Sequence, residues 1–272
     1  MPYAAVQPRI VHRIESRNLS QHEDGIELLT MGDLHVGDGN ADLPMIHAAV
    51  KWLLAEDNRY AVIVGDLFNA ALRDSVSDPY TEQYTVQESR ELLVEMLSPV
   101  AERVLGVISG NHDHRVNKAI GDDPAAVVCA LAGMPYSGGE AFLNLKVGKW
   151  KHATTRAYSP VHYATYLHHG FGGGRLVGGK ANNLQRLRDI VSADLYVSGH
   201  THTPLVIPDV TWEMDANKGN VIERKQLFIA TGSSVDRGGG YAVRFGFKAL
   251  AKVWPVVHLA GTHKAMTATV EA

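Results

Sequence analysis

The stretch VLGVISGNHD, residues 104–113, decides the fold of this chain. Its first half, residues 104–108, is a short apolar run between polar residues, which predicts a buried strand. Gly110 then allows a sharp turn, and the ligand-capable side chains Asn111, His112 and Asp113 follow. In α/β proteins, ligands bind in the crevice at the carboxyl ends of the strands. The stretch therefore predicts either a binding site at a strand end or a polar loop that has this composition by chance.

Two earlier apolar segments end in the same kind of residue. Residues 26–30 lead into Asp33-Leu34-His35, and residues 60–64 lead into Gly65-Asp66. Side chains two residues apart on an extended chain point the same way, so Asp33 and His35 can face one point in space. Three successive strands that end in metal-type ligands favour the binding site over the chance loop.

Helical patterns separate these three strands. Residues 42–56 have apolar side chains at helical spacing after an Asp-Leu-Pro start, and residues 85–97 begin with a Thr-x-x-Glu capping box. Residues 70–83 are polar and predict a loop. Strands that alternate with helices imply a parallel sheet with crossover connections.

The second half of the chain is richer in strands. Two segments end in histidines: residues 158–167 lead into His168-His169-Gly170, and residues 195–197 lead into Gly199-His200-Thr201-His202. The remaining predicted strands are 10–14, 141–147, 204–208, 227–230, 241–247 and 256–267, and the predicted helices are 123–131 and 183–191. The sequence shows no repeat or linker. We therefore expect one domain over residues 1–272, with two sheets and an N-terminal extension at residues 1–25.

Composition restricts the class of protein. The chain has 272 residues and a net charge of −3, which provides no global attraction to nucleic acid or acidic membranes. The single cysteine, Cys129, lies in an apolar helical pattern and predicts a small buried side chain. A secretion signal and an apolar run of about 18 residues are both missing from the sequence. A cytoplasmic protein without a membrane partner is the expectation.

The strand ends together supply two carboxylates, one amide and four imidazoles. These residues are Asp33, His35, Asp66, Asn111, His169, His200 and His202. Seven ligands are too many for one metal ion, but they suit two adjacent ions if one carboxylate bridges them. Oxygen and nitrogen ligands without thiolate favour a catalytic site over a closed structural zinc site. Two ions about 3.5–4 Å apart form the clamp used for displacement at phosphorus.

In this order, the motifs D-x-H, G-D-x-x-N, G-N-H-D, H-G and G-H-x-H resemble those of the calcineurin-like metallophosphoesterase superfamily. The match runs from about residue 26 to 203. The resemblance implies a four-layer α/β/β/α sandwich of two mixed sheets with a dimetal site at its edge. The order of motifs in this chain also resembles that of phosphoesterases of bacteriophages and prophages, and more distantly that of the exonuclease subunit of double-strand-break repair complexes.

The resemblance implies a role for each matching residue. Asp33, His35 and His202 would hold one metal ion, and Asp66 would bridge. The ligands of the second ion would be Asn111, His169 and His200. The favoured metal is Mn²⁺, with Fe, Zn²⁺, Ni²⁺ and Mg²⁺ as alternatives.

Three further residues are candidates near this centre. His112 would bind a phosphate oxygen and protonate the leaving group, which suits an imidazole that titrates near neutral pH. Asp113 is expected to orient His112. Of the histidine pair, His169 is the expected ligand because it directly precedes Gly170. Arg175 lies in a glycine-rich basic loop and either holds the substrate phosphate or belongs to a solvated turn.

The sequence thus predicts a dimetal phosphoester hydrolase, in which a metal-bridged hydroxide attacks phosphorus and His112 acts as general acid. A phosphodiesterase is favoured over a phosphatase. A DNA exo- or endonuclease is one alternative, with nucleic acid as the substrate. A non-catalytic metal-binding scaffold for protein interactions is the other. The oligomeric state stays open.

Overall fold

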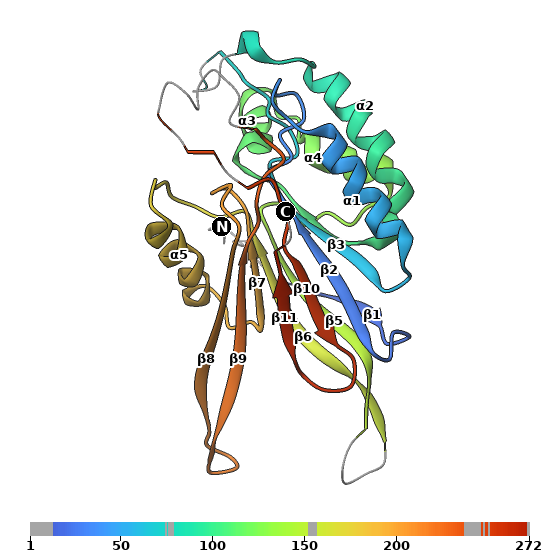
Figure 1. The fold of residues 1–272 in the computed structure, drawn as a ribbon, viewed down its shortest axis with the longest axis vertical. Coiled ribbons are helices and arrows are strands. Elements are labelled where there is room, and N and C mark those ends of the chain that lie inside the picture. The colour runs from blue at the N-terminus through green and yellow to red at the C-terminus, as the bar shows by residue number, and fades with distance from the viewer. Residues whose placement is uncertain are drawn as a thin grey trace, which may run out of the picture.

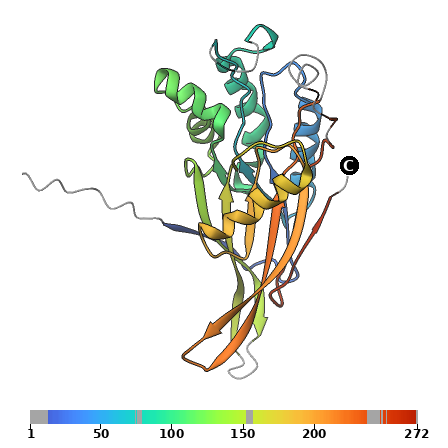
Figure 2. The same ribbon diagram turned by 90° about the vertical axis from the view of Figure 1, so that its left-hand side faces the viewer.

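The computed structural model describes residues 13–73, 75, 79–151, 157–236, 246, 248–249 and 251–270. Its strands form two mixed sheets that lie face to face, and helices cover both outer faces (Figures 1 and 2). This is the four-layer α/β/β/α sandwich that the sequence predicts, so the predicted fold class is confirmed.

The five-stranded sheet contains the three strands that precede the first ligand motifs. Its order is β11-β10-β2-β3-β4. The adjacent strands β2 (Gly25–Met31), β3 (Arg59–Val64) and β4 (Val104–Ile108) are parallel. Their carboxyl ends therefore reach the same edge of the sheet. On the other side, β10 (Val256–Ala260) and β11 (Met266–Thr269) form an antiparallel hairpin.

The six-stranded sheet has the order β1-β5-β6-β7-β9-β8. Its strands are β1 (Ile14–Leu19), β5 (Glu140–Lys151), β6 (Tyr158–His168), β7 (Leu195–Ser198), β8 (Leu205–Asp215) and β9 (Asn220–Ala230). Strand β6 is parallel to β7, so their carboxyl ends also share an edge. Strands β8 and β9 form a long hairpin that extends beyond the body of the sandwich (Figure 1).

The helices begin where the sequence provides caps. They are α1 (Leu43–Ala55), α2 (Val86–Leu97), α3 (Asn111–Ile120), α4 (Pro124–Ala132) and α5 (Val177–Gln185), with 3₁₀ turns at Pro79–Thr81, Ser98–Arg103 and Arg186–Asp189. Asp42 caps α1 by accepting a hydrogen bond from the Met45 amide, and Thr85 with Glu88 forms the predicted capping box. None of the described helices has the length and apolarity needed to cross a membrane.

Three apolar clusters hold the four layers together. The first lies between the helices α1, α2 and α4 and the five-stranded sheet, and it contains Cys129. The second lies between the two sheets. The third packs α5 against the six-stranded sheet. Alternate residues of one strand serve different clusters: Ile63 of β3 faces the helices, whereas Val62 and Val64 face the other sheet.

The structure corrects several predicted boundaries. The edge strand expected at 10–14 lies at Ile14–Leu19, where it pairs in parallel with β5. The strand expected over 256–267 is two strands with a turn between them. The strands expected at 204–208 and 227–230 are at least twice as long in the structure. Their outer halves pair with each other beyond the region that a second layer covers. Most of the strand expected at 241–247 lies outside the described residues.

Two helices also differ from expectation. The helix expected at 183–191 begins at Val177 and ends in a 3₁₀ turn after Gln185, so it includes glycines that the sequence places in a loop. Helix α3 was not expected, because its sequence, NHDHRVNKAI, is mostly polar. Only Asp113 and Val116 of this helix are buried.

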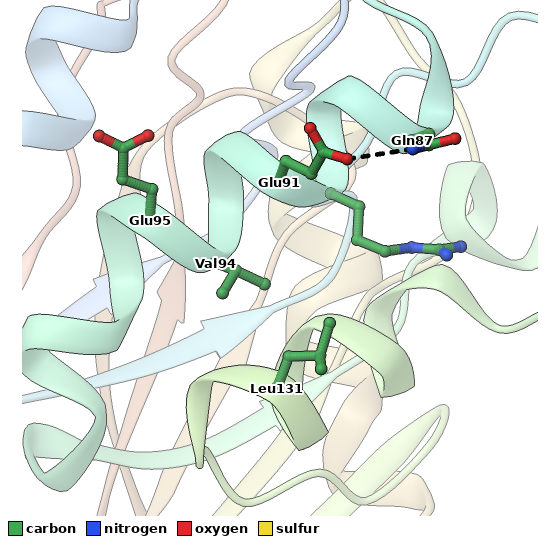
Figure 3. A pocket seen from close by; sticks show the side chains of 6 residues that line it. Gln87, Glu91, Val94, Glu95 and Leu131 are labelled. Atoms are coloured by element: carbon green, nitrogen blue, oxygen red, sulfur yellow. Dashed lines mark hydrogen bonds between the residues drawn. The ribbon is translucent and has the colours of Figure 1, made fainter.

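A pocket on the outer helical layer lies between α2 and α4 (Figure 3). Its lining consists of Gln87, Arg90, Glu91, Val94, Glu95 and Leu131. None of these residues belongs to a predicted ligand motif, so this pocket is separate from the candidate metal centre.

We expect the third apolar cluster to depend on Phe228, which is fully buried and stacks on Tyr196 with ring centroids 4.4 Å apart. Phe228→Ala should lower the free energy of unfolding by about 3–5 kcal/mol, because it removes a buried ring and leaves a cavity. Trp212→Ala on the same hairpin is the control, since Trp212 is 78% exposed. Its change should stay within about 0.5 kcal/mol in urea unfolding. Equal losses in both variants would contradict the assigned core.

Candidate metal centre

The predicted ligands gather at the edge of the sandwich where five strands end. Asp33 follows β2, Asp66 follows β3 and Asn111 follows β4. From the other sheet, His169 directly follows β6, and the turn after β7 carries His200 and His202. The two sheets therefore contribute opposite sides of one centre.

A first group consists of Asp33, His35 and His202. The Nε2 atoms of the two histidines lie 3.0 Å apart. Asp33 Oδ1 lies 3.8 Å from Nε2 of His35 and 3.4 Å from Nε2 of His202. The three ligand atoms thus surround one point.

A second group consists of Asp66, Asn111, His169 and His200. Asn111 Oδ1 lies 3.0 Å from His169 Nε2 and 2.8 Å from His200 Nδ1. Asp66 Oδ2 lies 3.2 Å from His169 Nε2. This group also surrounds one point, on the other side of Asp66.

One carboxylate oxygen belongs to both groups. Asp66 Oδ2 is 3.7 Å from His35 Nε2 in the first group and 3.2 Å from His169 Nε2 in the second. The other oxygen, Oδ1, accepts a hydrogen bond of 2.8 Å from the amide of His112. This bond fixes the rotation of the carboxylate and turns Oδ2 toward the two groups.

The donor atoms fit divalent ions. Nitrogen and oxygen ligands bound at about 2.0–2.2 Å and separated by about 90° lie about 3 Å apart, and most of the distances above are close to that value. The donors comprise carboxylate, amide and imidazole without thiolate, which suits first-row divalent metals. Asp33, His35, Asp66 and His169 are buried, whereas Asn111 is exposed. The centre is therefore open to solvent on one side.

The backbone at the ligands is strained. Six described residues other than glycine have a positive φ, and five of them are predicted ligands: Asp33, His35, Asp66, His200 and His202. Left-handed backbone of this kind costs free energy in residues with a side chain and is concentrated at functional sites. The surrounding contacts must maintain these conformations.

Residues after β9 supply part of that support on the Asp33 side. The hydroxyl of Ser233 donates to the carbonyl oxygen of Asp33 (2.9 Å), and the hydroxyl of Ser234 donates to that of Leu34 (2.7 Å). The Asp33 carboxylate accepts a hydrogen bond from the amide of His200, with Oδ2 at 2.9 Å. No local pattern in the sequence indicates a role for these serines, because they lie far from the ligand motifs in the chain.

Lys180 supports the loop that carries His200 and His202. Its ammonium group donates to the carbonyl oxygen of Thr201 at 2.9 Å and to the hydroxyl of Thr203 at 2.6 Å. The basic glycine-rich segment thus reaches the metal centre through Lys180 of α5. Arg175, the residue predicted to bind substrate, is exposed in the loop before α5.

His168 and His169 are adjacent in the chain but have different hydrogen-bond partners. His169 donates from Nδ1 to the carbonyl oxygen of Val64 at 2.7 Å, which leaves its Nε2 free to act as a ligand. His168 Nδ1 instead accepts a hydrogen bond of 2.8 Å from the amide of Gly170. His168 is therefore engaged in the turn and not in the ligand groups.

His112 lies beside the first group. The centroid of its ring is 4.5 Å from that of His35. Its Nδ1 donates to the carbonyl oxygen of Asn69 at 2.7 Å, which leaves Nε2 as the nitrogen that can exchange a proton with a ligand. Burial, together with the charge of Arg115, lowers the pKa of His112, although Asp66 acts in the opposite direction.

Asp113 does not have the expected contact with the His112 ring. Its carboxylate accepts hydrogen bonds from the amides of Gly110 (2.8 Å), Phe68 (3.1 Å) and Leu67 (3.4 Å). The physical reason is that Asp113 is the third residue of α3, so its side chain reaches back to cap the helix. Asp113 fixes the backbone on which Asn111 and His112 stand, and the carbonyl of Asn69 orients the imidazole.

Two further residues at this edge lie outside the motifs that the sequence predicts. Glu82 accepts hydrogen bonds from the Asn69 side chain (2.5 Å) and the Ala71 amide (3.0 Å), which holds the segment that contacts His112. Arg115 donates from Nη1 to the carbonyl oxygen of Ala70 at 3.4 Å. A prediction of helix α3 would have revealed Arg115, since it lies three residues after His112.

Asp66 also controls protonation in the metal-free centre. Burial alone would lower the pKa of His169, but the Asp66 and Asp33 carboxylates and the hydrogen bond to the Val64 carbonyl together raise that pKa to about 10. The contact between Asp66 and His169 lowers the pKa of Asp66, against the effect of burial. Near neutral pH, His169 of the metal-free protein therefore carries a proton where a metal ligand must be neutral.

We expect metal uptake to release protons for this reason. His169 must lose its proton to bind a metal ion, so apparent Mn²⁺ affinity should rise with pH, by up to about tenfold per unit below pH 10 for one proton. Calorimetric titration in buffers of different ionisation enthalpy measures the protons released. In His169→Ala, the number released at pH 7 should fall. A wild-type affinity that does not change between pH 6 and 8 would contradict this assignment.

Close approach of two glycines to Asp66 is a further requirement of the centre. A Cβ atom on Gly110 would collide with Oδ1 of Asp66, and one on Gly65 would lie 2.5 Å from the amide nitrogen of Gly110. Only glycine fits at these positions.

Gly110→Ala should therefore displace the shared carboxylate and weaken binding of Mn²⁺ by at least about tenfold, as loss of a supporting contact does. Metal content after dialysis measures the effect. Gly139→Ala is the matched control, because a Cβ there would meet nothing within 4 Å. Two tightly bound ions in Gly110→Ala would show that the carboxylate is not held as described.

Comparison with known proteins agrees with this geometry. The model of the calcineurin-like phosphoesterase family matches residues 26–204, which include all the ligand motifs. The chain therefore belongs to the calcineurin-like phosphoesterase family. A search of curated proteins found no match.

Solved structures similar to this chain have low sequence identity. A metallophosphoesterase from Sphaerobacter thermophilus has 15% identity and a TM-score of 0.40, and the match covers 91% of this chain and 89% of the other. For Vps29 of Chaetomium thermophilum, the identity is 14%, the TM-score 0.39 and the coverage 90% and 97%. GAP50, an anchor in the inner membrane complex of Plasmodium, has 12% identity and a TM-score of 0.45, and the match covers 91% of this chain and 84% of the other.

Proposed function

We propose that this protein is a phosphodiesterase that depends on two divalent metal ions and uses His112 as general acid. The observation that carries the proposal is the position of Asp66 Oδ2, which faces both ligand groups while Oδ1 is held by the amide of His112. A carboxylate oxygen shared in this way is what two adjacent ions require.

The ligand assignment follows the two groups. Asp33, His35 and His202 would hold one ion, and Asp66 would contribute to both. The other ion would be held by Asn111, His169 and His200. When bound, the two ions would supply a water of lowered pKa and neutralise charge on the phosphoryl oxygens. We propose Mn²⁺ as the metal; the oxygen and nitrogen donors suit it, as they also suit Fe, Zn²⁺ and Ni²⁺.

His112 has the contacts that a general acid needs. Its Nδ1–H is used by the carbonyl oxygen of Asn69, so proton transfer takes place at Nε2. One of its ring nitrogens lies within 4.8 Å of the ligand atoms of His35 and Asp66. Its lowered pKa makes the protonated ring a better proton donor to the oxygen of a leaving alcohol.

The charge of the site supports a diester substrate. Near neutral pH a phosphate monoester is mostly a dianion, because its second pKa is about 6, whereas a diester carries one negative charge. Beside the ligand groups, Arg115 is half-buried, and burial lowers the pKa of His112. Beside the metal ions that the site would hold, the Arg115 guanidinium would supply one further positive charge for the single negative charge of a diester.

The deciding experiment uses metal-stripped protein to which Mn²⁺ is returned. Bis(p-nitrophenyl) phosphate should be cleaved faster than p-nitrophenyl phosphate. His112→Ala should lower kcat/KM by about 10²–10⁴-fold, which is the usual contribution of general acid catalysis. His114→Ala is the matched control, since His114 is exposed on the same helix.

Each other result has a definite meaning. Faster cleavage of the monoester would replace the phosphodiesterase by a phosphatase. Cleavage of single- or double-stranded DNA with strong salt dependence would establish the nuclease alternative. Two bound ions without hydrolysis of any of these substrates would contradict the proposal and favour a non-catalytic scaffold.

A further inference from the structure

Arg115 stands beside His112 at the rim of the metal centre. It lies three residues after His112 and four after Asn111 on α3, so the three side chains are neighbours on one side of the helix. Its Nη1 contacts the carbonyl oxygen of Ala70, next to the Asn69 carbonyl that accepts from His112. Arg115 and His112 are thus tied to the same short segment of chain.

That segment is firmly held. Glu82 binds both the Asn69 side chain and the Ala71 amide, and Ala70 between them has a φ of 45°. Non-glycine residues adopt this conformation only where their surroundings enforce it. The carbonyl oxygens that His112 and Arg115 contact are therefore held in fixed positions relative to each other.

The charge of Arg115 is unbalanced, unlike that of comparable residues. Among the described residues, no carboxylate lies within 4.0 Å of its guanidinium. Every other half-buried arginine in the described part of the chain has such a partner. These paired arginines are Arg17, Arg59, Arg90, Arg103, Arg188 and Arg224.

An unpaired cation that is partly removed from water is costly unless an anion joins it. The carboxylates of Asp66 and Glu82 are the negative charges whose interaction raises the pKa of Arg115 against the effect of burial. Both are already engaged, Asp66 with the two ligand groups and Glu82 with the Asn69–Ala71 segment. The described residues therefore offer no further carboxylate to pair with Arg115, which leaves its guanidinium open to an external anion.

We propose that Arg115 binds a phosphate oxyanion of the substrate next to His112. A planar guanidinium with several donors matches phosphate oxygens better than an ammonium group does. The oxyanion belongs either to the reacting phosphate or to a second phosphate on the leaving group, as in a nucleotide or an oligonucleotide. This inference rests on the proposed function, and it assigns substrate binding to Arg115 in place of the exposed Arg175.

Binding of two simple anions to Mn²⁺-loaded protein tests the assignment. Isothermal titration with inorganic phosphate and with pyrophosphate is carried out on wild type, Arg115→Met and Arg115→Lys. Methionine gives a long side chain without a charge. Lysine keeps the charge but lacks the planar guanidinium with its several donors. Lys118→Ala is the matched control, because Lys118 is an exposed cation on the same helix. Metal content and melting temperature are measured for each variant.

Weaker binding in Arg115→Met, by about 10- to 100-fold, is the expected result for a lost charge-assisted contact. The loss in Arg115→Lys should be smaller, and Lys118→Ala should bind as wild type does. An effect on phosphate assigns Arg115 to the reacting phosphate. An effect on pyrophosphate alone assigns it to the second phosphate.

Unchanged binding of both anions in Arg115→Met would overturn the inference, and so would a wild type that binds neither. Loss of Mn²⁺ or of folding in both Arg115 variants would also overturn it, because Arg115 would then support the structure. Hydrolysis is measured separately. A wild type that binds phosphate through Arg115 but cleaves no phosphoester would refute the proposed function and leave the anion site intact.

Discussion

The whole site depends on holding one buried carboxylate between two groups of ligands. Asp66 can present Oδ2 to both groups only because the His112 amide fixes Oδ1. That amide reaches Asp66 because β3 and β4 are adjacent parallel strands. The close approach also requires glycine at positions 65 and 110, since a Cβ atom at either position would collide with the neighbouring chain. The order of the strands, the two glycines and the start of α3 are thus consequences of one geometric requirement. A second carboxylate, Asp33, is bound in the same manner by the amide of His200 from the opposite sheet.

Strain at the ligands explains why so large a scaffold surrounds a small site. Five ligand residues have left-handed backbone, and each such conformation opposes folding by about 1–3 kcal/mol. Three apolar clusters provide the opposing stabilisation. The clusters also hold the two sheets together. Hydrogen bonds such as those from Ser233 to Asp33 and from Lys180 to Thr201 then keep the ligand backbone in place relative to the sheets. Strain that a flexible loop would relieve is therefore retained at the point where the metal ions would bind.

Sequence patterns predict most of the fold and the composition of the centre, but not its supports. The strands that end in ligands were recognisable because they are apolar runs followed by Asp, Asn or His. Helix α3 could not be recognised, because it buries only two side chains and its stability comes from Asp113, which caps it and binds the β3 loop. Because helix α3 was not predicted, Asp113 was expected to orient His112, and this prediction was wrong. Spacing alone cannot distinguish a carboxylate that faces a ring from one that faces backbone amides. Ser233, Ser234 and Lys180 were missed because long-range contacts leave no local pattern.

Helix α3 combines functions that are separate elsewhere in the site. The amide of His112 holds Asp66, the first two side chains of the helix are a candidate ligand and the candidate acid, and its second turn carries Arg115. The other ligands are attached to strands of both sheets and do not depend on the second turn of this helix. On this proposal, a substitution at Arg115 would change the charge that faces a substrate and leave the ligands at the strand ends with their own contacts. Substrate preference in this chain can accordingly be set by the second turn of α3, and metal binding by the strand ends, with Asp113 as the connection between them.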